Sequence, residues 1–351
     1  MNTRIRKLRD VMKKKGVDAV LVTSEPNMFY LSGFTGTAGW LFITPSQKYI
    51  LSDSRFWEQV ENESPNFRLV KAERDDGTQG VKNILKRYPN IKKIGFEDDK
   101  VSFAMYKKLT KEINNVKFVA LEGAVSELRM IKSEEEIKFI EKAALIANKA
   151  LKRVLKIIKP GMTERYIASL LLTEIKELGA EKESFDFHVP SGANAALPHI
   201  LPTDKKIKKN ELIIIDLGAK YKGYCSDMTR TICLGTMSAK QEKIYKIVER
   251  AQKAAINYIK AGVVCGDVDK KARNLIEKEG YGKNFMHGLG HGTGIEIHEA
   301  PNFRPNVKTV LRPGMVLSVE PGIYISGFGG VRIEDLILVT RGGCRILTQD
   351  H

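Results

Sequence analysis

Several features that mark particular classes of protein are missing from this sequence. No apolar run approaches the roughly 18 residues that a helix needs to span a bilayer. The amino-terminal segment MNTRIRKLRDVMKKKGVD carries charges throughout, so it lacks the apolar core of a secretory signal. The four cysteines form no C-x-x-C pair and are too sparse for a disulfide framework, which fits a reducing compartment. We therefore expect a cytoplasmic protein without membrane partners.

Acidic residues are scarce relative to basic ones, at 42 against 58, and the net charge is +16. Such a balance is typical of nucleic-acid binders. Here, however, the lysines are scattered in short groups such as Lys13–Lys15 and Lys205–Lys209, with acids between them. The aromatic and basic pattern of an RNA-binding sheet is also missing. We interpret the charge as a solvated lysine-rich surface and do not expect a nucleic-acid partner.

A length of 351 residues suggests about two domains. In residues 1–122 short apolar strands alternate with amphipathic helices, which predicts a small α/β domain without a recognisable catalytic motif. The predicted strands are Asp18–Val22, Gly39–Thr44, Tyr49–Ser52, Arg68–Val70, Lys93–Phe96 and Lys117–Val119, and the predicted helices are a surface helix at the amino terminus, Arg55–Glu61, Gly80–Tyr88 and Phe103–Glu112.

A long helix opens the second domain. Ser133 followed by Glu136 forms a capping box, apolar residues then recur at helical spacing, and Pro160–Gly161 ends the pattern. We place the domain boundary between about Ala120 and Ser133 and assign residues 1–122 and 123–351 to the two domains.

The second domain contains a weak internal repeat. The segment IKPGMTERYIASLLLTEIKELGA is echoed by IKAGVVCGDVDKKARNLIEKEG, a glycine-containing turn followed by an amphipathic helix. His188 and His287 lie 99 residues apart, as do His199 and His298, and each half closes with two strands and a tight loop. The repeat predicts a pseudo-symmetric α+β domain with its site between the halves.

Three of the six histidines lie in HGLGHGTGIEIHEAP, residues 287–301. His287 and His291 have the spacing of a helical zinc protease, but four alternating glycines disfavour a helix by about 1 kcal/mol each. The first histidine is also not followed by a glutamate. We predict a glycine-rich turn that enters a strand at Ile295–His298.

Four carboxylates occur where apolar strand interiors are expected. Asp216 ends Ile213–Ile215 and Glu320 follows Val316–Val319; Asp227 and Glu334 lie eleven and fourteen residues further on, in the returning segments. Unpaired buried carboxylates lose several kcal/mol of solvation and repel each other.

Arg332 alone cannot neutralise four acids, but divalent metals can. The predicted ligand set is Asp216, Asp227, Glu320, Glu334 and one histidine, with Asp227 and Glu334 bridging two ions about 3.5–4 Å apart. The oxygen-rich shell favours Mn or Co, with Fe and Zn as alternatives.

These segments carry a resemblance to a known family. SGANAALPH, IDLGAKYKGYCSDMTRT, HGLGHGTGIEIHEAP, LSVEPGIYI and GGVRIEDLILVT resemble, in order, the motifs of the "pita-bread" metallopeptidases. Within them the chain is most similar to the Xaa-Pro peptidases, the Xaa-Pro dipeptidases (prolidases) and aminopeptidases P. YLSGFTGTAGWLFI and SDSRFWEQ resemble their smaller non-catalytic domain. The resemblance implies an α/β creatinase/prolidase-like domain before a pita-bread catalytic domain, and a homodimer.

The resemblance also implies a role for each site residue. His291 would be the ligating histidine, and Glu320 would also shuttle protons to the leaving nitrogen. His298 would stabilise the tetrahedral intermediate, and His199 would contact the substrate near the scissile bond. His287 would form a wall of the proline-side pocket. We group Arg332 with His287 among the substrate-binding residues. Because Arg332 lies beside Glu334, we favour for it the role of orienting that ligand.

The expected reaction is hydrolysis of the Xaa-Pro bond of dipeptides or short peptides by a dinuclear metal-dependent exopeptidase. An aminopeptidase P acting on longer peptides is the alternative, because the arginine that some prolidases carry after HExP is here Asn302, with Arg304 nearby. A methionyl aminopeptidase would use the same five ligands but lacks the extra amino-terminal domain. A non-catalytic pita-bread binding module would typically lack the ligands.

Overall fold

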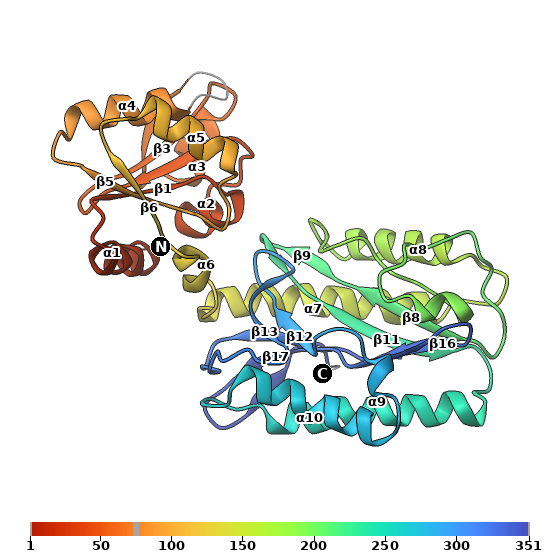
Figure 1. Cartoon of the computed structure of the whole chain (residues 1–351). Helices are drawn as coiled ribbons and strands as arrows, with labels where there is room; N and C mark the ends of the chain where they lie inside the picture. Colours follow the sequence, from red (N-terminus) through yellow and green to blue (C-terminus); the bar gives the residue numbers. More distant parts are fainter. Residues whose placement is uncertain (1, 73–76, 350–351) are drawn as a thin grey trace. The chain divides into compact units, whose positions relative to one another are not determined.

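The structure is a computed structural model that describes residues 2–72 and 77–349. By its contacts the chain divides into two compact units, Met1–Arg129 and Met130–His351, and both contain helices and strands (Figure 1). Among the described residues, no helix is both long enough and apolar enough to cross a bilayer.

The first unit is built on a six-stranded sheet with the order β4-β3-β2-β1-β5-β6. The strands are β1 (Ala19–Val22), β2 (Trp40–Ile43), β3 (Lys48–Ser52), β4 (Arg68–Lys71), β5 (Lys93–Phe96) and β6 (Lys117–Ala120). The four apolar residues of β1 are all buried, since β1 pairs with β2 on one side and β5 on the other. The sequence predicted all six strands to within one residue at each end.

In the described part of this unit, six helices accompany the sheet: α1 (Asn2–Lys15), α2 (Glu25–Ser32), α3 (Trp57–Glu63), α4 (Gly77–Arg87), α5 (Phe103–Glu112) and α6 (Ala124–Leu128). Helix α5 begins where predicted, because the Ser102 hydroxyl accepts a hydrogen bond from the backbone N–H of Met105. The sequence did not predict α2 or α6. The buried face of α2 includes the polar residues Asn27 and Ser32, so its apolar residues alone do not recur at helical spacing.

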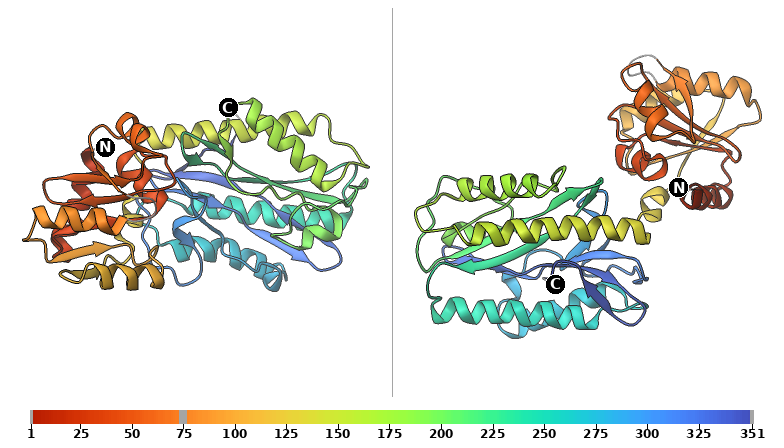
Figure 2. Two further views of the ribbon diagram at one scale, coloured as in Figure 1. Left: turned by 90° about the horizontal axis from the view of Figure 1, so that it is seen from above. Right: turned by 180° about the vertical axis from the view of Figure 1, so that it is seen from behind.

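Four long helices flank the strands of the second unit: α7 (Glu134–Leu155), α8 (Glu164–Glu177), α9 (Ala239–Tyr258) and α10 (Cys265–Lys278). α7 and α8 cover one side of the strands, and α9 and α10 cover the other (Figures 1 and 2). The Ser133–Glu136 capping box at the start of α7 is confirmed, although the helix ends at Leu155, before Pro160. This arrangement of two helix pairs around strands confirms the predicted α+β class.

The strands between the helices form four small sheets. Their orders are β10-β9-β7, β11-β8, β13-β12-β14-β17-β18 and β15-β16. The strands are β7 (Lys182–Glu183), β8 (Leu212–Leu217), β9 (Ala219–Tyr221), β10 (Tyr224–Cys225), β11 (Met228–Cys233), β12 (Gly290–Gly292), β13 (Glu299–Phe303), β14 (Val316–Val319), β15 (Gly322–Ile325), β16 (Gly329–Arg332), β17 (Asp335–Val339) and β18 (Cys344–Ile346).

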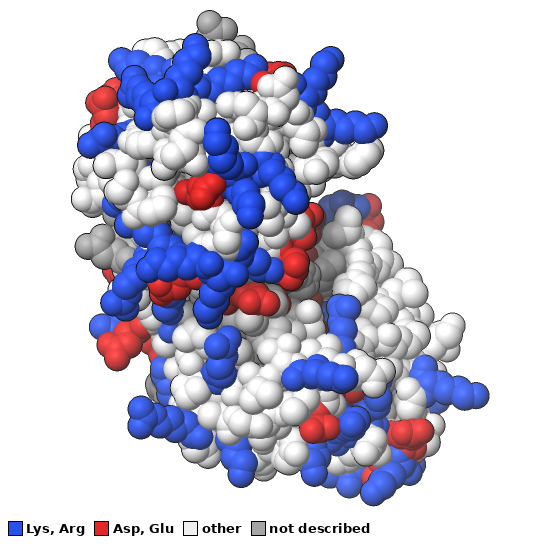
Figure 3. All heavy atoms as spheres, turned by 60° about the vertical axis from the view of Figure 1, so that its left-hand side comes forward, with Lys and Arg blue, Asp and Glu red and all other residues white. Residues whose placement is uncertain are grey.

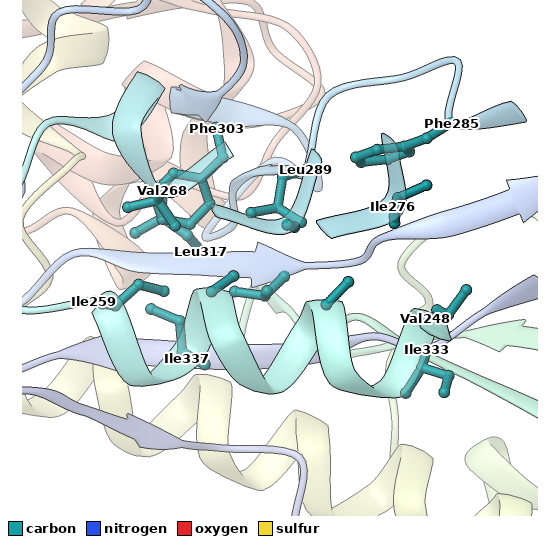
Figure 4. Close-up of a cluster of buried hydrophobic side chains, with 14 of the residues drawn as sticks. Val248, Ile259, Val268, Ile276, Phe285, Leu289, Phe303, Leu317, Ile333 and Ile337 are labelled. Atoms are coloured by element: carbon teal, nitrogen blue, oxygen red, sulfur yellow. The ribbon is translucent and has the colours of Figure 1, made fainter. Parts of the chain in front are cut away.

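Each helix pair of the second unit packs on its own core. One core joins α7 and α8 to β8, and the other joins α9 and α10 to β14 and β17 (Figure 4). Full burial of an aliphatic side chain contributes about 1.5–3 kcal/mol, so these cores fix the strands firmly. The other face of each strand, which carries Asp216 in β8 and Ser318 in β14, is directed away from the core on which that strand packs.

Lysine and arginine side chains are spread over the face of the molecule shown in Figure 3, with acidic side chains among them.

Candidate metal centre

Strand alternation directs the predicted acids to the region between the two cores. Ile213, Ile215 and Leu217 of β8 pack in the core beneath α7 and α8, so Asp216 points to the opposite face. Leu317 and Val319 of β14 pack beneath α9 and α10 in the same way. Ser318 and Glu320 therefore also point away from their core.

The register between paired strands brings Asp227 and Glu334 close to Asp216 and Glu320. Thr229 of β11 pairs with Asp216, so Asp227 lies two residues along the same strand face. The pairing of Val319 with Asp335 between β14 and β17 places Glu320 opposite Glu334, at the point where this ladder ends. Glu334 lies between β16 and β17, and its backbone N–H donates to the carbonyl of Thr229, which ties the two halves together.

The predicted site residues meet in one cavity of about 190 Å³. Its walls include every residue to which the sequence assigned a role: His199, Asp216, Asp227, His287, His291, His298, Glu320, Arg332 and Glu334. Phe185, His188, Ile297 and Arg304 contribute further to the lining. Histidines from both repeats thus share the cavity with the four acids.

His291 lies at the centre of the acids. Its Nε2 is 3.5 Å from Oδ2 of Asp227 and 3.4 Å from Oε1 of Glu320. Its Nδ1 lies 3.1 Å from the carbonyl oxygen of Gly292, which favours the tautomer with the proton on Nδ1. The Nε2 lone pair is then directed to the carboxylates. Ligand atoms of Asp227, His291 and Glu334 all lie within 4.8 Å of one another.

Two fully buried carboxylate oxygens in this cluster have no hydrogen-bond partner among the described residues. They are Oδ1 of Asp216 and Oε1 of Glu334. The second oxygen of each acid is held, since Asp216 Oδ2 lies 2.6 Å from Arg332 and Glu334 Oε2 accepts from Thr229 at 2.8 Å. An unsatisfied buried acceptor costs about 1–3 kcal/mol, so these two oxygens call for a cation.

The electrostatics of the cluster point the same way. Burial, and then the neighbouring carboxylates, raise the pKa of Asp227 and of Glu334 well above their ordinary values. Burial also raises the pKa of Glu320 and lowers that of His291. Neutral imidazole and closely packed carboxylates are the ligands that divalent transition metals prefer. The five side chains therefore fit a divalent metal centre.

His298 does not lie in a strand, so the prediction of a strand at Ile295–His298 is wrong. Those residues form bends between β12 and β13, and His291 is the histidine that lies in a strand. The turn is closed by hydrogen bonds from Gly294 N–H to the carbonyl of Glu296 and from the Thr293 hydroxyl to the carbonyl of Ile297. The imidazoles of His291 and His298 remain close, with ring centroids 4.3 Å apart.

The comparisons with known proteins agree with this geometry. The metallopeptidase family M24 matches residues 138–341, and the creatinase/prolidase N-terminal domain matches residues 4–131.

The chain belongs to metallopeptidase family M24.

Relatives of this M24 protein match it over nearly its whole length. A Xaa-Pro dipeptidase of Pyrococcus horikoshii is 40% identical over 349 residues, which cover 99% of this chain and 97% of the relative. The structure of a Xaa-Pro dipeptidase from Bacillus anthracis aligns with a TM-score of 0.95 at 40% identity, covering 99% and 98% of the two chains. An X-Pro aminopeptidase from Thermotoga maritima aligns with a TM-score of 0.92 at 34% identity, covering 99% and 98%.

Arg332 of the M24 domain contacts a different acid from the one we expected. Its guanidinium binds Asp216 directly and reaches Glu334 only through Thr229, whose hydroxyl lies 3.1 Å from Arg332 Nε. Arg332 also donates to the Tyr324 hydroxyl at 3.0 Å, and that hydroxyl lies 3.0 Å from Nε2 of His287. Arg332 thus directs its hydrogen bonds to other residues of the protein, namely Asp216, Thr229 and Tyr324.

Sequence reasoning missed two polar side chains that hold the acids. Thr229 bonds Glu334, and Ser318 donates to Oε1 of Glu320 at 3.1 Å while accepting from the backbone N–H of His291. Each lies two residues from a predicted acid, Thr229 after Asp227 and Ser318 before Glu320. The two-residue period of a strand could have identified both.

Arg304 and Asn302 have different places in the M24 domain. Asn302 pairs with His291 across β12 and β13, whereas Arg304 lines the cavity. The Arg304 side chain lies over Gly288, where an added Cβ would come within 2.4 Å of its Cγ. Its exposed guanidinium makes no hydrogen bond or ion pair with a described residue, in contrast to Arg332.

Proposed function

We propose that this protein is a dinuclear metal-dependent Xaa-Pro dipeptidase. One observation carries the proposal: four acids and His291, from separate strand segments, converge in one cavity with two buried carboxylate oxygens left unpaired. The similarity to Xaa-Pro dipeptidases, at 40% identity over almost the full chain, supports the substrate class.

Asp216, Asp227, His291, Glu320 and Glu334 would hold two divalent ions. Mn or Co suits the oxygen-rich ligand set best, and Fe and Zn are alternatives. When bound, such ions supply Lewis-acid activation of the attacking water and of the substrate carbonyl.

The chain itself would handle the protons and the developing charge. Glu320 lines the cavity, and by the resemblance to the Xaa-Pro peptidases its carboxylate would take a proton from water and pass it to the leaving nitrogen. Burial lowers the pKa of His298, and a neutral imidazole can donate its N–H to the oxyanion. His199, which lines the same cavity, would contact the substrate beside the scissile bond, and His287 would form the wall of the proline-side pocket.

Arg304 favours the dipeptidase over an aminopeptidase P. A dipeptide places a free carboxylate one residue beyond the scissile bond, and a desolvated carboxylate needs a cation. Arg332 is engaged by Asp216 and Tyr324, whereas Arg304 lines the cavity with its guanidinium free to bind. In longer substrates the carboxylate would lie beyond this position, and Arg304 would contribute little.

We also propose that the protein acts in the cytoplasm as a homodimer. All four cysteines are free thiols, which suits a reducing compartment. The homodimer rests on the resemblance to the Xaa-Pro peptidases.

The test is hydrolysis of Ala-Pro, Ala-Pro-Ala and Met-Ala-Ala by metal-stripped protein loaded with Mn or Co. The proposal predicts cleavage of Ala-Pro alone. Release of alanine from Ala-Pro-Ala as well would shift the assignment to an aminopeptidase P, and preference for Met-Ala-Ala to a methionyl aminopeptidase. If no peptide is cleaved with either metal, the proposal fails and a non-catalytic binding module takes its place.

A further inference from the structure

A fully buried carboxylate lies outside the metal cluster, at the start of α8. Glu164 is 0% exposed and accepts hydrogen bonds from three residues of one loop. Oε1 accepts from Ser191 N and Oγ, both at 2.8 Å, and from Asn194 Nδ2 at 3.1 Å. Oε2 accepts from Asn194 Nδ2 at 3.2 Å and from Thr203 N and Oγ1 at 3.1 and 2.6 Å. Residues at both ends of the loop 191–203, which includes the short 3₁₀ helix η1 (Gly192–Ala196), are thus bound to one side chain.

The chemistry of this contact requires a carboxylate. Every group facing Glu164 is a donor, and burial of its charge is offset by these hydrogen bonds and by the amino-terminal end of α8. The ammonium of Lys205, 2.7 Å from Ser191 Oγ, adds a nearby positive charge. An amide at this position would turn an N–H₂ group towards N–H and O–H donors, so glutamine has the right size but the wrong pattern.

The loop that Glu164 closes carries His199 into the cavity. Between the two bound ends, Arg332 NH1 lies 3.5 Å from the carbonyl oxygen of Pro198, and His188 Nδ1 lies 3.1 Å from that of Ile200. These two contacts flank His199 on either side in the chain. The position of the imidazole is therefore set by the cavity wall on one side and by the Glu164 contacts at the loop ends.

The second half of the domain holds its own histidine segment in a comparable way. Asp269 of α10 is 0% exposed, accepts from the backbone N–H of Leu289 at 3.1 Å and pairs with Arg273. Arg273 in turn donates to the carbonyl of His287 at 2.8 Å. A buried acid on the second helix of each half thus fixes the segment that brings a histidine to the cavity.

We propose that Glu164 is a positioning residue, which acts on Xaa-Pro hydrolysis by holding His199 in place through the loop 191–203. The role in hydrolysis rests on the proposed function, whereas the effect of Glu164 on His199 can be measured without it. Because misplacement of a substrate-contacting group by about 1 Å can cost about 100-fold in rate, loosening this loop has a large expected effect.

The experiment compares Glu164→Gln with Glu174→Gln in the Mn-loaded full-length protein. Glu174 lies on the same helix, and among the described residues its side chain pairs only with Arg153 near the surface, so it is a matched control. Glu164→Gln is expected to lower kcat/KM for Ala-Pro by about 10- to 100-fold, and Glu174→Gln by less than about 2-fold. In a His199→Ala background, the effect of Glu164→Gln should shrink to less than about 3-fold, because the residue on which it acts is gone.

An equal loss in both backgrounds would overturn the proposal, since Glu164 would then act by another route. Thr203→Val removes one of the donors to Glu164, together with an acceptor for Lys205 N and Asn194 Nδ2, and provides a second variant if Glu164→Gln does not fold. The His199 ring signals in a ¹H–¹⁵N spectrum, recorded on protein loaded with diamagnetic Zn in place of Mn, give a readout that needs no activity. They should shift in Glu164→Gln or Thr203→Val and stay in place in Glu174→Gln. Unchanged His199 signals in Glu164→Gln and Thr203→Val would overturn the proposal. If these signals shift but the wild-type protein cleaves no peptide, only the proposed function fails.

Discussion

The guanidinium NH2 of Arg332 lies 2.6 Å from Oδ2 of Asp216, and the other carboxylate oxygen of Asp216 has no hydrogen-bond partner among the described residues. Arg332 is 3% exposed, so this ion pair is screened little by water. The pair fixes the orientation of Asp216 and leaves one oxygen for a metal ion.

Replacement of Arg332 by lysine should weaken metal binding. Lysine keeps the charge but cannot hold Asp216, Thr229 and Tyr324 at once. Loss of such an outer contact typically costs about 10- to 100-fold in metal affinity. Competition with a chelator would measure the Mn affinity. Arg250→Lys, which alters an exposed pair with Glu279, is the control and should leave the affinity unchanged. Equal affinities in all three proteins would refute this role for Arg332.

Removal of the His298 imidazole should impair the chemical step without removing metal. His298→Ala is expected to lower kcat for Ala-Pro by about 100- to 1000-fold, because the oxyanion loses a donor. Metal content by mass spectrometry should stay at the wild-type level, since His298 lies outside the ligand cluster. A large loss of metal in His298→Ala would instead assign this histidine to the metal centre.

The stability of the metal-stripped protein should depend on pH because of the buried acids. Burial and neighbouring acids raise the folded-state pKa of Asp227 and Glu334, so the folded protein retains protons that the unfolded chain loses. Their contribution to stability is therefore present below the ordinary carboxyl pKa and is lost as the pH rises through the raised folded-state pKa. Bound Mn should offset this loss, by about 2.7 kcal/mol at 100 times the Kd.

The buried histidines titrate with the opposite sign, because burial lowers the pKa of His291 and His298. The contribution of the acids is therefore read from the difference between wild type and Asp227→Asn in thermal unfolding as the pH is raised. We expect the metal-stripped variant to gain in Tm over wild type with rising pH. A Tm difference that does not change with pH would mean that the pKa of Asp227 is not raised in the folded protein.

Arg304 should discriminate between free and blocked dipeptides. Arg304→Met is expected to raise KM for Ala-Pro by about 10-fold or more, since a charge-assisted hydrogen bond contributes about 1.5–3 kcal/mol. With Ala-Pro amide, which has no carboxylate, the same substitution should change KM by less than about 2-fold. Arg345→Met, on a surface pair with Glu141, is the control. Equal effects on the two substrates would exclude Arg304 from carboxylate recognition.

Much of the fold could be predicted because its signals are local. The strands of the first unit are short apolar runs between turn residues, and the Ser133–Glu136 box marks the start of α7 within four residues of sequence. The acids of the candidate site stood out for a similar reason. Asp216 and Glu320 directly follow apolar runs, where burial makes an unpaired carboxylate costly.

The remaining features depend on contacts between distant residues. Ile295–His298 has the alternation of a strand, but hydrogen bonds from Thr293 and Gly294 close it into a turn. Arg332 is two residues from Glu334 in the sequence, yet it binds Asp216, 116 residues away. Consecutive side chains of a strand point to opposite faces of the sheet. Which side chains meet across the sheet is decided by the register between the strands.

The most direct test of the metal centre is a crystal structure of Mn-loaded protein with an anomalous difference map. We expect two peaks about 3.5–4 Å apart, enclosed by Asp216, Asp227, His291, Glu320 and Glu334. A map with no peak in this cavity, or with Mn bound only elsewhere on the chain, would contradict the proposed dinuclear site.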